Sequence, residues 1–223
     1  MQSRIRYNGS TIDIVCGSPV YSHAKAIVFP ISKTELLKPI SNGFFINELQ
    51  WDNQPENFND EYQRMQERFC QGQFRKAQYK LQNTELSPNL PHYGIPVQGD
   101  GKTQLLIIET YDPSRISSQG KLNGNIAHAF SALLPLGGLE TAYAHGITEI
   151  AIPVIPYLTD NNSHEHRLTI EASAKSCANA AKRFIDDYNA KVKIHMHLPY
   201  FEPSSTTTLE KIAPAINATM QTF

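Results

Sequence analysis

Three acidic residues stand in loops that follow predicted strands. Asp112 comes directly after the apolar run 105–111. Asp160 and Glu165 lie in the polar stretch that follows the apolar run 149–155. Carboxylates in such loops can activate water, stabilise positive charge at a sugar carbon, or clamp a guanidinium through paired hydrogen bonds. Acidic residues also serve as solvated loop, turn and cap residues, so both interpretations stay open here.

Two pairs of histidines raise the question of a metal site. His164 and His166 flank Glu165, and His195 and His197 share one face of a predicted strand. Imidazole is a common metal ligand, but no third and fourth ligand follow at a recognisable spacing. Histidines on a strand are more often packed or exposed, so the sequence predicts no metal and no cofactor.

Composition excludes several classes of protein. Of 223 residues, 40% are hydrophobic and 18% charged, which favours a packed core over disorder. The 20 Lys and Arg residues are balanced by 21 Asp and Glu residues, so no basic excess points to a nucleic-acid partner. Three widely separated cysteines, Cys16, Cys70 and Cys177, give no disulfide framework and suit a reducing compartment.

The N-terminal sequence is too polar for a signal peptide, and no apolar run approaches the roughly 20 residues that cross a bilayer. These features predict a soluble protein without membrane insertion. It would be cytoplasmic or secreted by a specialised system into a host cell.

Apolar runs and helical periodicity alternate along the chain. A near-continuous apolar run is typical of a strand that is covered on both faces, and strands that alternate with helices favour a mostly parallel sheet. The pattern predicts one α/β domain over residues 1–223. Strands are expected at 11–16, 24–31, 105–111, 149–155 and 191–198, and an irregular excursion at about 82–103. Helices are expected at 59–77, 167–189 and 206–221, and 124–145 is expected to be one helix or a broken pair of helices that stops at Gly146.

In parallel sheets, ligands bind beyond the carboxyl ends of the strands. The loops that begin at Pro30, Tyr111, Pro156 and Pro199 are therefore the expected location of a binding site. Because the three acidic residues belong to two of these loops, the topology predicts that their carboxylates approach each other at one edge of the sheet.

Three stretches resemble the macrodomain family in the family's own order. Gly17–Val28 resembles its Gly-Asp-Ile turn and following strand, and Leu106–Pro113 resembles the strand that ends near His-Thr-Val-Gly-Pro. Ala142–Ile155 resembles the helix end, glycine and Ser-Ile-Ala-Phe-Pro-Ala-Ile strand. The resemblance extends roughly from Ile12 to Ile216 and is strongest to divergent members such as bacterial-pathogen effector macrodomains. It implies a three-layer α/β/α fold with a mixed, mostly parallel central sheet.

The resemblance also implies a ligand, which is ADP-ribose or an ADP-ribosylated protein. Ser18 and Pro19 match the positions that hold the adenine, and Ser32 matches the asparagine that orients the distal ribose. Tyr157 falls in the diphosphate loop, and Tyr200 or Phe201 would stack on the adenine. The segment with Asn42, Gly43 and Phe44 would cover the distal ribose.

Several of these positions depart from the family pattern. Ser18 replaces an aspartate, Ser32 replaces an asparagine, and Pro156–Asn161 replaces a glycine-containing diphosphate loop. Without glycine, the backbone approaches a phosphate less readily. The acidic loops instead suggest an ADP-ribosylhydrolase that cleaves the N-glycosidic bond of protein-linked ADP-ribose, with arginine as the expected acceptor. The alternatives are a non-catalytic ADP-ribose-binding module and a scaffold that has lost the ligand.

Overall fold

The structure is a computed structural model of the 223-residue chain, and it describes thirteen segments. Only the backbone is described for residues 29–32, 75–111, 157–159, 165–167 and 205–208 within them. The described segments are 3–17, 22–32, 75–76, 79–81, 84–86, 89–90, 92–96, 103–111, 135–154, 157–159, 165–167, 169–198 and 205–221.

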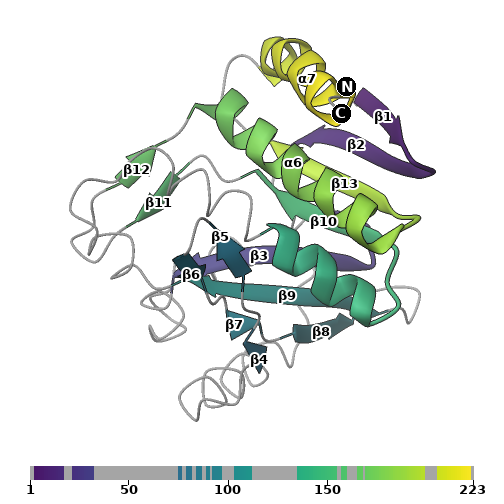
Figure 1. The fold of residues 1–223 in the computed structure, drawn as a ribbon, viewed down its shortest axis with the longest axis vertical. Coiled ribbons are helices and arrows are strands. Elements are labelled where there is room, and N and C mark those ends of the chain that lie inside the picture. The colour runs from purple at the N-terminus through teal and green to yellow at the C-terminus, as the bar shows by residue number, and fades with distance from the viewer. Residues whose placement is uncertain are drawn as a thin grey trace.

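A mixed nine-stranded sheet forms the centre of the molecule (Figure 1). Its strands lie in the order β1-β2-β13-β10-β3-β9-β7-β4, and β8 also pairs with β9. The five strands from β2 to β9 run parallel, whereas β1, β7 and β8 pair antiparallel with their neighbours. The bounds are β1 Ser3–Tyr7, β2 Ser10–Cys16, β13 Lys193–Leu198, β10 Glu149–Pro153, β3 Ala26–Ser32, β9 Thr103–Tyr111, β7 Asn89–Leu90, β4 Arg75–Lys76 and β8 His92–Pro96.

The predicted α/β class with a mostly parallel sheet is confirmed. The N-terminal strand β1 was not among the predicted strands. It pairs with β2 through a two-residue turn in which Asn8 has φ 46° and Gly9 has φ 81°. Positive φ at both central residues is the requirement of a type I′ hairpin, and Asn-Gly is its preferred sequence. The turn is therefore a local signal that could have identified this hairpin.

Short strands also occur where the sequence predicted other structure. The segment 82–103, predicted to be irregular, contains β6 (Thr84–Leu86), β7 and β8. Gly94 and Pro96 weaken a strand pattern, but among the described strands β8 pairs with β9 alone, and strands of this kind tolerate both residue types. The predicted helix 59–77 is wrong at its end, because Arg75–Lys76 forms β4; its residues 59–74 lie outside the described segments. β6 pairs with β5 (Tyr79–Leu81).

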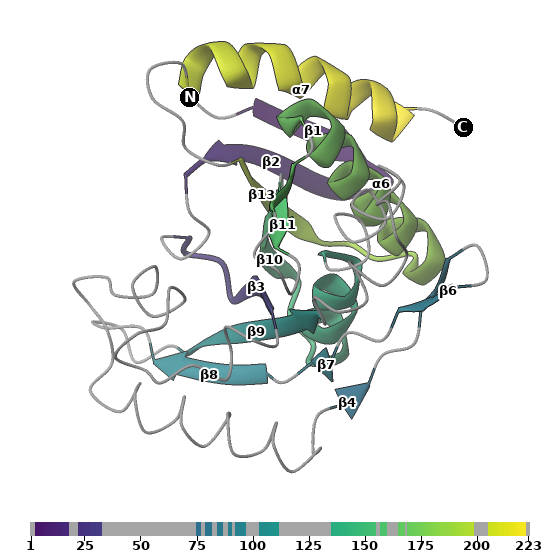
Figure 2. The ribbon, with the colours of Figure 1, turned by 90° about the vertical axis from the view of Figure 1, so that its left-hand side faces the viewer.

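Three described helices cover one face of the sheet, as Figures 1 and 2 show: residues 135–144, α6 (Ile170–Tyr188) and α7 (Ser205–Gln221). Helix α6 begins three residues later than predicted, because Thr169 caps its first turn by accepting a 3.1 Å hydrogen bond from the N–H of Ala172. The helix at 135–144 ends just before Gly146, where the sequence predicts a stop. This residue has φ 74° and donates its N–H to the carbonyl of Tyr143.

The helices and the sheet enclose an apolar core. The helix at 135–144 approaches β3 so closely that a β-carbon on Gly138 would lie 2.4 Å from both γ-carbons of Val28. Only glycine allows this approach. No helix in the described segments is both long and apolar enough to cross a membrane. The core includes Ile12, Ile14, Val28, Leu139, Ile150, Ile152, Ala174, Cys177, Ala178, Ala181, Phe184, Ile194, Met196, Leu198, Leu209 and Ile216.

Candidate functional site at the carboxyl edge of the sheet

The carboxyl ends of five parallel strands meet at one edge of the sheet. Strands β2, β13 and β10 end there at Cys16, Leu198 and Pro153, and β3 and β9 end alongside them. A small antiparallel hairpin of β11 (Tyr157–Thr159) and β12 (Glu165–Arg167) lies beyond this edge (Figure 1). Since ligands of parallel sheets bind at such an edge, it is the candidate site.

Gly17 links the ends of β2 and β13. Its N–H donates to the carbonyl of Leu198 at 2.9 Å, and its own carbonyl lies 3.2 Å from Nδ1 of His197. Gly17 has φ 116°, whereas a β-carbon there would meet nothing within 4 Å. Glycine is therefore required by the backbone conformation and not by lack of space. Ser18 and Pro19, the positions expected to hold the adenine, follow Gly17 in the sequence.

His197 is a buried imidazole at this edge, with 6% of its surface exposed. Burial lowers the pKa of His197 to about 4, so the ring is neutral near neutral pH. Because Nδ1 faces the carbonyl of Gly17, Nδ1 carries the proton and Nε2 is an acceptor. Nε2 is buried and has no hydrogen-bond partner within the described part of the chain. The sequence indicated a His-x-His pair here but not this difference in burial.

The first turn of α6 faces the same edge, because α6 follows the loop after β10 and runs back along the sheet. Ser173 lies in this turn with a buried hydroxyl that has no partner among the described residues. One turn further on, the thiol of Cys177 lies 3.8 Å from the carbonyl of Pro153, and burial raises the pKa of this thiol. Cys177 is thus a protonated core residue, and the positive end of the α6 dipole points at the candidate site.

Three residues that the sequence assigned to the site lie in described strands. Ser32 is the last residue of β3 and pairs with Tyr111 of β9. Tyr157 begins β11 and pairs with Arg167, whereas Glu165 begins β12 and pairs with Thr159. The other assigned residues, Ser18, Pro19, Asn42, Gly43, Phe44, Asp112, Asp160, Tyr200 and Phe201, lie outside the described segments.

The hairpin corrects one expectation. Tyr157 and Glu165 were expected in an open loop, but they belong to paired strands. The pairing places Glu165 opposite Thr159, the residue that precedes Asp160. Two three-residue strands with β-forming residues such as Tyr157 and Thr159 satisfy their backbone groups against each other. The register therefore places Glu165 directly across from the last residue of β11.

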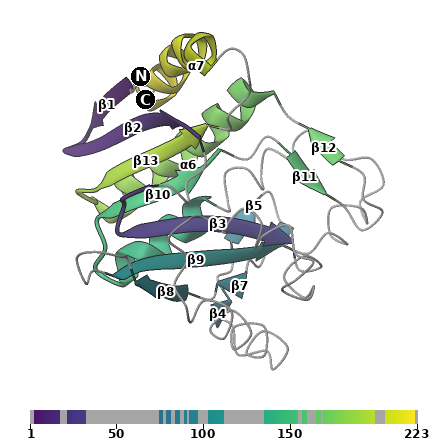
Figure 3. The same ribbon diagram turned by 180° about the vertical axis from the view of Figure 1, so that it is seen from behind.

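Figure 3 shows the sheet from the side opposite α6. The strand register places a row of charged residues from β1, β2, β13 and β10 on this face. Arg4 binds the fully buried carboxylate of Asp13 through two hydrogen bonds of 2.6 and 3.0 Å, which lower the pKa of Asp13. Lys193 and His195 contact Glu149 at 2.8 and 3.0 Å and lower its pKa. Nowhere in the described segments do three His, Cys, Asp or Glu side chains group as metal ligands. The row is a set of ion pairs.

Comparison with solved structures identifies the fold. The chain is similar to an Oceanobacillus iheyensis macrodomain with MES bound, at 14% identity and a TM-score of 0.63 over 98% of both chains. It is similar to the same macrodomain with ADP, at 15% identity and a TM-score of 0.62 over 98% of both. A mutant of that macrodomain with ADPR also gives 15% identity and a TM-score of 0.62, covering 97% of this chain and 99% of that one.

A second macrodomain structure, at lower similarity, also supports this fold. The macro domain of ganglioside induced differentiation associated protein 2 matches at 10% identity and a TM-score of 0.53, covering 93% of this chain and 84% of that one. No family model and no curated protein matches the sequence. The chain has the macrodomain fold, a three-layer α/β/α arrangement with a mixed central sheet, as the resemblance implied.

Proposed function

We propose that this chain binds ADP-ribose at the carboxyl edge of its sheet and hydrolyses the bond between ADP-ribose and a modified protein. The observation that carries the proposal is the fold match over nearly the whole chain to macrodomain structures that contain ADP or ADPR. The candidate site lies where a parallel sheet binds its ligand. The positive end of α6 at this edge also favours an anion such as a diphosphate.

The finer proposal is that arginine is the modified residue. Asp112 follows β9 in the sequence, and Asp160 and Glu165 come after β10; both strands end at this edge. One carboxylate would activate water, while the others would stabilise positive charge at the anomeric carbon or hold the guanidinium. Ser18, Pro19, Tyr200 and Phe201 would contact the adenine end. Ser32, Asn42, Gly43 and Phe44 would lie along the distal ribose, and Tyr157 beside the diphosphate.

Asp160→Ala tests the catalytic proposal. We expect release of ADP-ribose from an arginine-modified protein to fall at least about tenfold, while thermal unfolding is unchanged. Asp187→Ala is the matched control, because Asp187 is an exposed acid in the last turn of α6 that pairs with Arg183 on the surface. Activity of Asp160→Ala equal to that of the control would remove Asp160 from the mechanism.

A non-catalytic binding module is the second candidate, because a β11–β12 hairpin occupies the segment where the resemblance implies a glycine-containing loop. Calorimetry with ADP-ribose separates the two candidates. Binding together with turnover of an ADP-ribosylated protein supports the hydrolase, and binding without turnover of arginine-, glutamate- or aspartate-linked ADP-ribose supports the module. Absence of binding at millimolar ADP-ribose, with the fold intact, would contradict both.

A further inference from the structure

Strand β1 lies at one edge of the central sheet, and no described strand pairs with its outer side. In a two-residue hairpin the closing pair, here Tyr7 and Ser10, exchanges backbone hydrogen bonds, and such pairs alternate along the ladder. Ile5 and Ser3 therefore bond to β2. The N–H and C=O groups of Arg4 and Arg6 consequently point away from β2, toward the open edge. An edge of this kind can accept a further strand.

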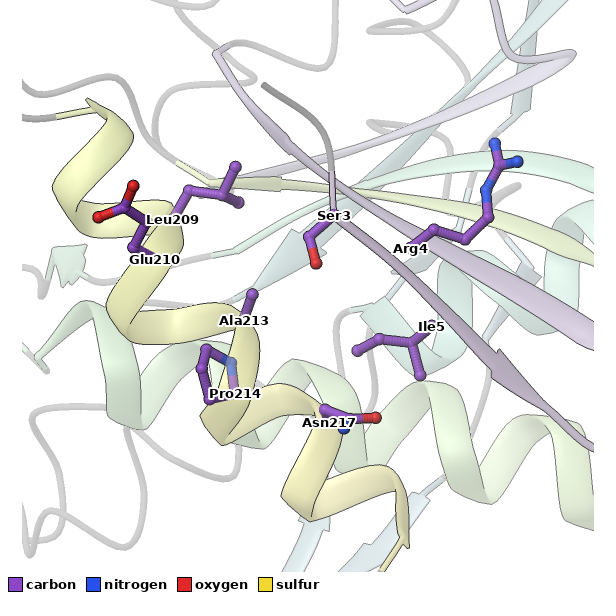
Figure 4. A pocket seen from close by; sticks show the side chains of 8 residues that line it. All are labelled: Ser3, Arg4, Ile5, Leu209, Glu210, Ala213, Pro214 and Asn217. Carbon is purple, nitrogen blue, oxygen red and sulfur yellow. The ribbon is translucent and has the colours of Figure 1, made fainter.

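A groove of about 510 Å³ runs between this edge and α7 (Figure 4). Three consecutive residues of β1 line it, which means that the strand's backbone edge itself forms one wall. Figure 4 shows Ser3 and Ile5 pointing toward the helix, whereas the Arg4 side chain points away from it. The opposite wall is one face of α7, formed by Leu209, Glu210, Ala213, Pro214 and Asn217.

The helix wall combines apolar surface with a backbone carbonyl that lacks its usual helical donor. Ala213 is half-buried and Pro214 is exposed, so both offer apolar contact to a small side chain, and the buried Leu209 lies at the base of this wall. Pro214 has no N–H, and the carbonyl of Glu210 therefore lacks the donor that the helix would otherwise provide four residues later. The groove thus has hydrogen-bonding groups on the strand side and an apolar patch with one carbonyl on the helix side.

The charged side chains of β1 favour one kind of added strand over another. Arg4 and Arg6 lie on the same face of the strand, and both are exposed. Arg4 binds Asp13, while Arg6 has no ion-pair partner among the described residues. A second copy paired antiparallel through Ile5 would place each Arg4 opposite the other copy's Arg6, and like charges in this arrangement destabilise a pair. An acidic strand would find complementary charge instead.

We propose that this groove binds an extended acidic peptide as an added strand on β1. Residues opposite Arg4 and Arg6 in the peptide would be Asp or Glu, because they emerge on the arginine face. The residue between them would be small and apolar, since it enters the groove toward Ala213 and Pro214. This partner site is separate from the carboxyl edge and does not depend on the proposed function.

The first test uses a short peptide of alternating glutamate and valine, with a lysine–valine peptide as its counterpart. In ¹⁵N-labelled protein we expect saturable shifts for β1 and α7, and slower hydrogen exchange at the amides of Arg4 and Arg6. The amides of Ile5 and Tyr7, already bonded to β2, should keep their exchange rates. Shifts without protection of Arg4 and Arg6, equal binding of both peptides, or no binding would each overturn the proposal.

The second test uses substitutions. Arg6→Glu should weaken binding of the glutamate peptide at least about fivefold and improve binding of the lysine peptide, whereas Arg183→Glu on α6 should change neither. Ala213→Trp fills the groove and should abolish binding. If this variant unfolds, the exposed Asn217→Trp serves the same purpose. Unchanged binding in Arg6→Glu, or light scattering that shows peptide-independent dimers formed through β1, would contradict the proposal.

Discussion

Strand β13 presents opposite chemistry to the two faces of the sheet. Toward α6 and α7 it carries Ile194, Met196 and Leu198, all fully buried in the core. On the other face it carries Lys193, His195 and His197, within a row of ion pairs and hydrogen bonds. One face is held by the removal of apolar surface from water, and the other by paired charges and a buried neutral imidazole.

The two faces are expected to respond differently to substitution and to pH. Apolar packing is insensitive to pH and loses stability in proportion to the volume removed. Ion pairs and a buried histidine respond to protonation, and their contribution depends on how well each group is shielded from water. Substitutions on the two faces should therefore differ in both size and pH dependence.

The largest loss is expected on the apolar face. Phe184 of α6 is fully buried and packs edge-on against Tyr143, with ring centroids 5.5 Å apart. Phe184→Ala should lower the free energy of unfolding by about 3–5 kcal/mol, with no pH dependence between pH 5 and pH 8. Denaturant unfolding at several pH values measures this. A loss below about 1 kcal/mol would mean that the helix layer is not well packed on the sheet.

A pH-dependent loss of intermediate size is expected from His197 on the polar face. Its pKa is about 4 in the folded chain and about 6.5 in the unfolded chain. Between these values only the unfolded chain binds the proton, so stability falls as the pH drops from about 6.5 toward 4 and then levels off. The total loss is about 3 kcal/mol.

His197→Gln isolates this effect, because glutamine keeps a donor for the carbonyl of Gly17 but does not titrate. The difference in stability between wild type and variant should shrink over the same pH range. The carboxylates Asp13 and Glu149 have lowered pKa values, so their contribution is lost only at more acidic pH. Parallel pH profiles for wild type and His197→Gln would refute the assignment of a buried neutral imidazole.

The same contrast explains which parts of the fold were predictable from sequence. The strands β3, β9 and β10 are apolar over most of their length, so composition alone indicates them. Strand β1 has only Ile5 as a buried apolar residue, and its signal lay in the Asn8–Gly9 turn instead. Tyr188 continues the apolar stripe of α6 at the correct spacing but is 46% exposed; it is the last residue of the helix, and its ring packs against Tyr143 and Phe184.

The candidate site was less predictable than the fold. Parallel topology was enough to place it at the carboxyl edge, but pairing within 157–167 was not indicated by the polar sequence around Asp160. Periodicity also cannot distinguish His195 from His197, which share one face. The difference arises because His197 lies beside the end of β2, where the carbonyl of Gly17 turns toward it, whereas His195 contacts the partly exposed Glu149.

The smallest expected effects compare two ion pairs on the polar face. Asp13 is fully buried and depends on Arg4, whereas Glu149 is 34% exposed and contacts both Lys193 and His195. Arg4→Met leaves a buried carboxylate without its donor and should cost about 1–3 kcal/mol. Lys193→Met should cost less than about 1 kcal/mol, because water and His195 still solvate Glu149.

The pH dependence of Arg4→Met follows from the lowered pKa of Asp13. The stability that Arg4 provides is present above the unfolded pKa of about 3.9 and is lost as the pH falls through the folded value. Wild type and Arg4→Met should therefore converge in acid. Adding Asp13→Asn to Arg4→Met should recover part of the loss near neutral pH, because the uncompensated charge is then removed. Equal losses for Arg4→Met and Lys193→Met would show that burial of Asp13 does not set the strength of its pair.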